Sequence, residues 1–329
     1  MVKQYTVVDT FSGAGGSSLG WKMANFKELL AVEFDADAIA TFRMNFPEVN
    51  LFAGDIAKLS GEEALRITGL KPGELDVFNG SPPCQSFSTA GKRKLNDPRG
   101  QLFLEYSRLL STFKPKVFVF ENVTGMVKGH MKQEYLKVIN HLRECGYKAT
   151  GQVMNAKFYN VPQSRERVII IGVRDDLGIE PSHPKPQSVP ITPREAFKGL
   201  TDNSGKEFPD WLKKAALEIP AGNYSSKYVR EAFLKHKGSS SSAISFSLLS
   251  WDRTAPAIIK SWIAAGGIGH PNKQRYLNLS ELKRLASFPD EFQFPGDFTK
   301  GLARIGNCVP PNMMKAIAEH IRDEILSKV

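Results

Sequence analysis

Short apolar runs alternate with longer segments of mixed polarity over the first half of the chain. The runs are rich in β-branched and aromatic residues, as is typical of buried strands; they are Gln4–Asp9, Glu28–Glu33, Leu75–Asn79, Val117–Glu121 and Arg167–Val173. The segments between them have the length and periodicity of helices, over Ser17–Asn25, Asp35–Asn45, Gln101–Phe113 and Gln133–Cys145. This alternation predicts an α/β domain with a parallel sheet, in which ligands bind at the carboxyl ends of the strands.

The pattern changes near Ile179, where the proline-rich stretch IEPSHPKPQSVPITP predicts a semi-rigid connector. Strand and helix signals are weak from there to about Gln274, a region that holds 13 Lys and Arg against 8 Asp and Glu. Regular patterns return at Leu279–Leu285 and in a last helix over Asn312–Leu326. We therefore expect a large domain, an irregular basic insert, and a return of the chain to the large domain.

Composition and charge narrow the class of protein. The chain has 329 residues, of which 41% are hydrophobic and 24% charged, as in an ordinary globular protein. It has no apolar run near the roughly 18 residues that span a bilayer. Because Met1–Thr10 reads as a strand and not as a signal sequence, we expect a cytoplasmic protein that does not bind a membrane. The net charge of +10 favours a polyanionic partner, with nucleic acid ahead of an anionic membrane surface.

Polar turns follow three consecutive predicted strands. VVDTFSGAGGSSLGW reads as a strand, a turn and a helix start, and Gly13, Gly15 and Gly16 let its backbone approach a ligand closely. Glu33 ends the next strand about 20 residues later, where a carboxylate accepts hydrogen bonds from ribose hydroxyls. The turn GDI follows a third short strand and supplies Asp55, which suits an adenine amine. These turns predict an adenosine-containing cofactor, and the loop spacing disfavours the NAD pattern G-x-G-x-x-G.

One cysteine lies on a stiff turn. GSPPCQSFS places Cys84 between prolines and small polar residues, directly after the strand Leu75–Asn79. The chain has only two other cysteines, Cys145 and Cys308, so neither a disulfide framework nor a zinc or other metal site is expected. A thiol needs activation to act as a nucleophile, because only a few per cent is ionised near neutral pH.

Charged residues at two further strand ends complete a candidate catalytic set. Glu121 ends the strand KVFVFEN, where a carboxyl group can hold or protonate a substrate heteroatom. QSRERVIIIG places Arg165 and Arg167 two residues apart, on one face if strand pairing already holds there. Each residue alone has an ordinary explanation as a packing thiol or a solvated charge. Together with Cys84 at one sheet edge, they indicate a catalytic site.

In this combination the sequence resembles the DNA cytosine-5 methyltransferase family. The matching motifs follow the family's order and are DTFSGAGG, the strand end at Glu33, GDI, SPPCQSFS, ENV at Glu121–Val123, QSRERV, LNLSELKRLASFPDEF at Leu277–Phe292 and GNCVPPNMMKAIAEHI at Gly306–Ile321. The resemblance covers nearly the whole chain except about 199–274, which is the position of the family's target recognition domain. One departure is Cys308, where the family more often has serine; the two residues are similar in size, so we expect little consequence.

The resemblance implies the S-adenosylmethionine-dependent methyltransferase fold, a Rossmann-like doubly wound α/β sheet with a smaller, irregular target recognition domain. The catalytic, cofactor-binding large domain is then expected over residues 1–190 plus 304–329. The small domain is expected over residues 191–303, with the target recognition region at about 199–274 and a hinge motif at 275–300.

The resemblance also implies an activity, methyl transfer from S-adenosylmethionine to carbon 5 of a cytosine in duplex DNA, with S-adenosylhomocysteine as product. The target base must be flipped out of the stack, at a cost of a few kcal/mol. The Cys84 thiolate attacks carbon 6, and Glu121 holds the ring nitrogen and exocyclic amine. Arg165 binds the ring carbonyl oxygen, and Arg167 orients the site. The implied cofactor residues are Phe11, Gly13, Gly15, Gly16, Glu33, Phe34, Asp55, Ile56, Leu102, Asn307 and Val309.

Two regions are expected to contact DNA. The stretch QSFSTAGKRKLNDPRG after Cys84 is long for a loop in an α/β domain, so we expect a lid that closes over DNA. A solvated charge run is the plainer alternative. Base contacts are expected from the target recognition region. The DNA-binding candidates are Ser86, Ser88, Lys92, Arg93, Lys94 and Arg99 in the lid, and Lys227, Arg230, Lys237 and Arg253 in the recognition region.

Two alternatives stay open. An RNA cytosine-5 methyltransferase of the tRNA-modifying branch shares most of this catalytic set, but the chain lacks the Cys-Phe-Thr tripeptide of that branch. A catalytically silent DNA-binding regulator is disfavoured because every chemical residue is present. The expected partner is double-stranded DNA, and the expected form is a monomer in the bacterial cytoplasm, associated with the nucleoid. The resemblance also allows a cognate restriction endonuclease in the same system, without a stable complex, or an orphan or phage enzyme.

Overall fold

The computed structural model describes residues 4–83, 98–129, 131–222, 226–241, 243, 246–260 and 267–329. The chain forms two compact units. Unit 1 comprises Met1–Asn155, Glu166–Pro186 and Pro311–Val329, and unit 2 comprises Ala156–Arg165 and Gln187–Pro310. The expected boundaries differ in three places, because Ala156–Arg165, residues 187–190 and residues 304–310 belong to unit 2 and not to the large domain. The first and last of these segments hydrogen-bond within unit 2, where Arg165 donates to the carbonyls of Ile258 and Gly306.

Unit 1 is built on a seven-stranded sheet with the strand order β3-β2-β1-β4-β5-β8-β6. Its strands are β1 (Thr6–Thr10), β2 (Lys27–Glu33), β3 (Leu51–Ala53), β4 (Val77–Gly80), β5 (Val117–Val123), β6 (Tyr147–Asn155) and β8 (Glu166–Arg174). The first five strands are parallel. β8 is antiparallel to both of its neighbours, β5 and β6. The prediction of a parallel sheet therefore holds for β1–β5 and is wrong for β8, and β6 was not predicted.

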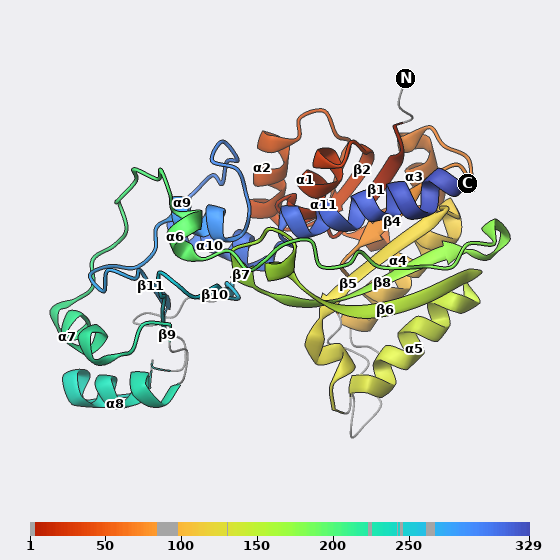
Figure 1. The fold of residues 1–329 in the computed structure, drawn as a ribbon. Coiled ribbons are helices and arrows are strands. Elements are labelled where there is room, and N and C mark those ends of the chain that lie inside the picture. Colours follow the sequence, from red (N-terminus) through yellow and green to blue (C-terminus); the bar gives the residue numbers. More distant parts are fainter. Residues whose placement is uncertain are drawn as a thin grey trace. The chain divides into compact units, whose positions relative to one another are not determined.

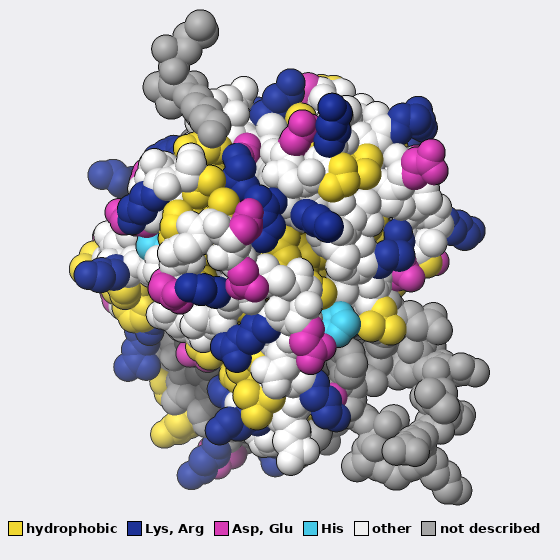
Figure 2. All heavy atoms as spheres, turned by 90° about the vertical axis from the view of Figure 1, so that its right-hand side faces the viewer, with side chains coloured by type: hydrophobic (Ala, Val, Ile, Leu, Met, Phe, Trp, Pro, Cys, Tyr) yellow, Lys and Arg dark blue, Asp and Glu magenta, His cyan; other side chains and the backbone are white. Residues whose placement is uncertain are grey.

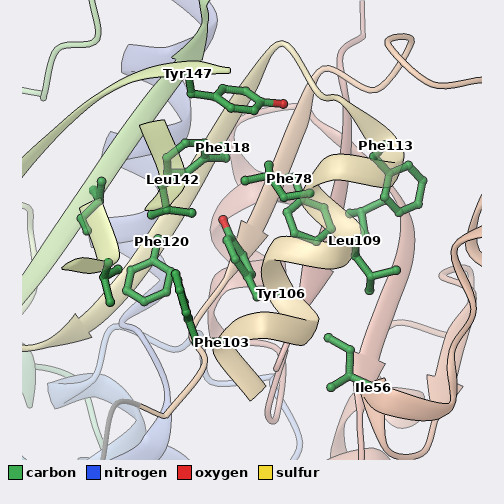
Figure 3. Close-up of a cluster of buried hydrophobic side chains, with 14 of the residues drawn as sticks. Ile56, Phe78, Phe103, Tyr106, Leu109, Phe113, Phe118, Phe120, Leu142 and Tyr147 are labelled. Carbon is green, nitrogen blue, oxygen red and sulfur yellow. The ribbon is translucent and has the colours of Figure 1, made fainter. Parts of the chain in front are cut away.

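Helices cover both faces of this sheet (Figure 1). They are α1 (Gly16–Met23), α2 (Ala36–Asn45), α3 (Gly61–Thr68), α4 (Pro98–Phe113), α5 (Met131–Glu144) and α11 (Pro311–His320), which the π-helical segment η6 (Ile321–Ile325) continues. On one face, residues of α3, α4 and α5 pack with alternate strand residues into a buried core, in which aromatic rings meet edge to face (Figure 3). Phe118 and Phe120 of β5 belong to this core, so Glu121 projects to the opposite face.

On that opposite face, the C-terminal helix α11 packs against α1. A Cβ atom on Gly20 of α1 would lie 2.5 Å from Met314 Cβ and 2.8 Å from the Pro311 carbonyl oxygen, so only glycine permits this approach. Arg322 also donates to the Ala24 carbonyl oxygen at 2.9 Å. The chain thus returns to its N-terminal strand and helix, as the sequence predicts.

Unit 2 has short strands and a helical core of its own. Its elements are β7 (Gln163–Ser164), β9 (Phe246–Leu248), β10 (Ala255–Pro256), β11 (Gly267–Gly269), α6 (Pro193–Ala196), α7 (Asp210–Glu218), α8 (Ser226–Lys237), α9 (Leu279–Leu285) and α10 (Phe298–Asn307). Apolar residues of α7 and α8 pack around Phe246 and Leu248. Glu281 of α9 is buried in a bidentate pair with Arg275 at 2.7 and 2.8 Å. The segment Leu279–Leu285, where a regular pattern was expected, is the helix α9, whereas α7 and α8 lie where no regular structure was expected. In the described part of the chain, no helix is long and apolar enough to cross a membrane.

Candidate active site

The predicted polar turns lie at one edge of the unit 1 sheet. Since β1–β5 are parallel, their carboxyl ends share that edge, and the strand order places the turn after β1 between Glu33 at the end of β2 and Gly80 at the end of β4. Glu121 near the end of β5 follows next. β8 runs the other way, so its first residues, including Arg167, lie beside the end of β5.

Glu33 is bonded to the glycine turn. Gly13 N donates to Glu33 Oε2 at 2.8 Å, while the backbone N–H groups of Phe34 and Asp35 donate to Oε1 at 2.9 and 2.8 Å. Glu33 is 8% exposed, and this burial raises its pKa while the three N–H groups lower it. A carboxylate oxygen has two lone pairs, so Oε2 keeps capacity for a hydroxyl donor such as that of a ribose.

The turn after β1 leaves room above its backbone. Gly13 and Gly15 have φ angles of +57° and +92°, which favour glycine, and a Cβ atom on Gly13 would meet nothing within 4 Å. At Gly15 a Cβ atom would lie 2.3 Å from Phe46. Phe34 is 72% exposed, which is unusual for a phenylalanine and leaves its ring available for stacking.

The other predicted cofactor residues fall into both units. In unit 1, Phe11 and Leu102 are partly buried against the core, and Ile56 is 3% exposed. Asp55 is exposed, and its carboxylate caps the backbone N–H of Ala57 at 3.0 Å. The first helical residue, Gly16, is buried. Asn307 and Val309 belong to unit 2, the first exposed and the second 7% exposed.

Glu121 and Arg167 form an ion pair. Arg167 Nε lies 2.7 Å from Glu121 Oε1, and the two side chains are 16% and 10% exposed, respectively. In the β5–β8 register, Glu121 lies opposite Ile169 and Val123 opposite Arg167. The two charged residues are therefore diagonal neighbours on one sheet face. The guanidinium compensates the burial of the carboxylate, which would otherwise be costly.

Arg165 has different surroundings. β8 begins at Glu166, so the two arginines do not share a strand, and the condition for a shared strand face, that strand pairing already holds at Arg165, is not met. Arg165 is 3% exposed, and its Nη1 and Nη2 donate to the carbonyl oxygens of Ile258 at 3.0 Å and Gly306 at 2.8 Å. Gln163 also accepts from Ile258 N at 2.9 Å. The motif Gln-x-Arg-x-Arg thus divides between the units.

The turn after β4 is tied to its neighbours up to Pro83. Ser81 Oγ donates to the Phe11 carbonyl oxygen at 3.3 Å, and Asn122 Nδ2 donates to the Pro82 carbonyl oxygen at 2.9 Å. Cys84 follows directly in the sequence. Cys84, Ser86, Ser88, Lys92, Arg93 and Lys94 lie outside the described residues, as does the side chain of Arg99.

A buried acid at this edge, Asp9, was missed from the sequence. It is 1% exposed and accepts hydrogen bonds from Ser17, Ser18 and Asn79. Burial raises its pKa to about 6, although these three donors lower it. The signal was an acid within the apolar strand TVVDT, since a carboxylate at a buried strand position needs dedicated partners.

The predicted recognition residues lie on exposed parts of unit 2. Lys227, Arg230 and Lys237 belong to the exposed face of α8, and Arg253 follows β9. Lys237 Nζ lies 5.1 Å from the ring centroid of Trp211. On the face in Figure 2, the described Lys and Arg side chains are dispersed among acidic and apolar ones and do not gather into one basic patch.

Comparison with known proteins identifies the family. The model of the C-5 cytosine-specific DNA methylase family matches residues 5–323. The type II methyltransferase M.PspPI of Psychrobacter sp. is 34% identical, over 97% of this chain and 79% of its own. M.Eco47II of Escherichia coli is 32% identical, over 98% of this chain and 80% of its own. A solved structure, described as a DNA modification methyltransferase encoded within an E. coli prophage, has a TM-score of 0.75 and 26% identity, covering 98% of this chain and 100% of that one. The chain therefore belongs to the C-5 cytosine-specific DNA methylase family, and its activity is methylation of cytosine at carbon 5 in DNA.

Proposed function

We propose that the chain methylates a cytosine flipped out of duplex DNA, through a covalent adduct with Cys84 and with S-adenosylmethionine as methyl donor. The observation that carries the proposal is the Glu121–Arg167 pair at the end of β5, beside the β4 turn that leads to Cys84. Both groups are largely buried, and the pair is held in place from two strands, which is the preorganisation that acid–base chemistry on a base needs.

The residues at the carboxyl ends of β1, β2 and β3 fit an adenosine-containing donor. The open space above Gly13, the remaining lone pair of Glu33 and the exposed ring of Phe34 suit a backbone contact, a ribose hydroxyl and an adenine face, respectively. Asp55 and Ile56 are proposed for the adenine edge. When bound, S-adenosylmethionine supplies an electrophilic methyl group for carbon 5.

In the proposed reaction, the Cys84 thiolate forms a bond to carbon 6 of the ring. The electron pair of the 5,6 double bond moves toward carbon 5, and Glu121 favours this shift by holding the ring nitrogen as it takes up a proton. Once carbon 5 carries the methyl group, the ring nitrogen returns its proton to Glu121, and loss of the carbon-5 proton to solvent restores the double bond and expels Cys84. The thiolate is therefore regenerated with no net change in the protein.

We assign the two arginines differently from the expectation based on resemblance. Arg167 is proposed as the cation beside the substrate, because it pairs with Glu121. Arg165 is proposed as a structural residue of unit 2, because both of its terminal nitrogens donate to backbone carbonyls. Arg165→Lys should then reduce stability, whereas Arg167→Lys should reduce kcat while the protein stays folded.

For DNA binding, we propose the exposed face of α8 as a phosphate-contacting surface. The helix buries Val229 and Phe233 and turns Lys227 and Arg230 outward. Each lost phosphate contact lowers the slope of log K against log salt by about 0.9. Lys227→Ala/Arg230→Ala should therefore lower that slope by about 2. Lys213→Ala, whose lysine is paired with Glu207 at 2.8 Å, is the control.

Transfer of a tritium-labelled methyl group tests the proposal. Wild-type protein should label duplex DNA and not tRNA, and Cys84→Ala should abolish labelling while DNA binding persists. Labelling of tRNA instead would favour the RNA alternative, and a DNA-binding protein that labels nothing would favour the silent regulator. Bisulfite sequencing of DNA from expressing cells then gives the sequence context.

We also propose a monomer in the bacterial cytoplasm, associated with the nucleoid, which acts beside a restriction endonuclease or as an orphan or phage enzyme. The type II relatives support a restriction–modification role. Elution at the mass of one chain in gel filtration, with and without DNA, tests the monomer. A dimer mass without DNA would contradict it.

A further inference from the structure

Asp9 is a buried acid that the proposed reaction does not use. It lies on β1, one residue before the strand ends, and is 1% exposed. Its Oδ2 accepts hydrogen bonds from Ser17 Oγ and, at 3.3 Å, from Ser18 Oγ. Its Oδ1 accepts from Asn79 Nδ2 at 2.6 Å. Both carboxylate oxygens of this buried side chain therefore accept hydrogen bonds, from donors on α1 and on β4.

The two serines belong to the first turn of α1, which directly follows the glycine turn. This helix lacks the usual N-terminal stabilisation, because Gly15 at the N-cap position has no side chain and no acidic residue lies in the first turn. Asp9 supplies the missing negative charge from the strand beneath the helix. The position of the first turn of α1, and of the glycine turn before it, therefore depends on this carboxylate.

Asn79 belongs to β4, one residue before that strand ends. The backbone there has little freedom. Thr10 Oγ1 donates to the Asn79 carbonyl oxygen at 3.1 Å, and a Cβ atom on Gly80 would lie 2.3 Å from the same Thr10 oxygen. A shift of Asn79 would be carried into Gly80–Pro83 and so to the chain that leads to Cys84. Among the described residues, Asn79 Oδ1 has no hydrogen-bond partner, so the bond to Asp9 is what fixes the amide.

We propose that Asp9 is a positioning residue that fixes the methyl-donor turn after β1 and the nucleophile turn after β4 relative to each other. The inference rests on the proposed function, since it assigns one turn to the donor and the other to Cys84. A neutral amide at position 9 carries no charge and has one acceptor oxygen in place of two, so Asp9→Asn loses the charge-assisted character of these bonds and, with the Asn79 amide oriented as it is, at least one of the three. Loss of a hydrogen bond to a charged group corresponds to about tenfold or more in an equilibrium constant.

Two measurements on the full chain read the two turns separately. Titration calorimetry with S-adenosylhomocysteine reports the donor turn. Release of tritium from DNA carrying 5-tritiated cytosine, without any methyl donor, reports attack by Cys84, because addition at carbon 6 lets carbon 5 exchange its hydrogen. Asp9→Asn should weaken S-adenosylhomocysteine binding and slow tritium release, each by about tenfold.

Glu28→Gln is the matched control. Glu28 is the second acid at Ser18, with Oε1 3.1 Å from Ser18 Oγ, and it makes no hydrogen bond to β4 among the described residues. Glu28→Gln keeps an acceptor oxygen for Ser18 Oγ, so S-adenosylhomocysteine binding and tritium release should both stay at their wild-type values. A change in only one of the two measurements for Asp9→Asn, or in neither, would overturn the inference. If wild-type protein itself releases no tritium, the proposed function fails instead.

A second set of variants serves if Asp9→Asn does not fold. Ser17→Ala and Asn79→Ala each remove one donor and keep the carboxylate. Since the two residues bond to opposite oxygens of Asp9, their effects on S-adenosylhomocysteine affinity should be non-additive. If the double variant shows the product of the two single effects, Asp9 does not couple the turns.

Discussion

The buried carboxyl of Asp9 makes a specific prediction for the pH dependence of stability. Its pKa is about 6 in the folded protein and 3.8 ordinarily, because burial outweighs three hydrogen-bond donors and the nearby Glu33 raises it further. A difference of about 2 in pKa corresponds to about 3 kcal/mol. The folded protein holds the proton more tightly than the unfolded chain does, so the contribution of Asp9 to stability falls as the pH rises through this window.

The magnitude between two convenient pH values follows from linkage. At pH 4.5 the unfolded carboxyl is already mostly ionised and the folded one is mostly protonated, whereas at pH 7 both are ionised. The contribution of Asp9 to the free energy of unfolding should therefore drop by about 2 kcal/mol from pH 4.5 to pH 7. Asp9→Asn has no such proton, so the stability of the wild type should fall relative to this variant by that amount.

Urea unfolding of both proteins at several pH values measures this difference, provided that their m-values agree. Glu48→Gln is a control for the sign. Lys22 pairs with the exposed Glu48 and lowers its pKa. The contribution of Glu48 to stability should therefore decrease as the pH falls, and this decrease should begin only below about pH 5. A stability difference between wild type and Asp9→Asn that stays constant from pH 4.5 to pH 7 would refute the reasoning.

Three further substitutions test packing and charge. Gly20→Ala should lower stability by about 1–3 kcal/mol in thermal unfolding, since its Cβ would lie 2.5–2.8 Å from atoms of α11; an unchanged melting temperature would contradict the contact. Asp76→Asn should lower the free energy of unfolding by about 1–3 kcal/mol, because Lys116 Nζ lies 2.6 Å from the Asp76 carboxylate and the Lys116 side chain is only 19% exposed. A loss below about 0.5 kcal/mol, the value of a surface ion pair, would show that the pair is solvated. Glu281→Gln should lower the free energy of unfolding by about 3–5 kcal/mol and make unit 2 more sensitive to proteolysis, because it leaves the buried Arg275 without its carboxylate partner. An unchanged rate of proteolytic cleavage would contradict this.

Local patterns in the sequence predict the ligand-facing edge well. Strand ends are marked by polar residues after apolar runs, so Glu33, the turn after β1 and Glu121 were placed on the correct elements. These features depend on residues that are neighbours in the chain. The regular pattern at Leu279–Leu285 also depends on near neighbours, since the Asn278 cap and Glu281 of α9 form a capping box within four residues.

Features set by distant residues could not be predicted in the same way. Periodicity does not encode strand direction, so β8 reads like any buried strand although it pairs antiparallel with β5 and β6. Arg165 is another example. Its partners, the carbonyls of Ile258 and Gly306, are 93 and 141 residues away in the sequence. The spacing of the two arginines suggests a shared face only if strand pairing includes Arg165, and β8 begins one residue later.

The central claim is that Cys84 bonds to carbon 6 of a cytosine in duplex DNA during methyl transfer. Duplex DNA with 5-fluorocytosine at the target position tests it most directly, because fluorine cannot leave carbon 5 as a cation and the adduct should persist. With S-adenosylmethionine present, we expect a protein–DNA complex that survives denaturing gel electrophoresis, maps to the peptide containing Cys84, and is absent in Cys84→Ala. If no such complex forms on DNA that the enzyme methylates, or if Cys84→Ala forms it equally, the account of the mechanism is wrong.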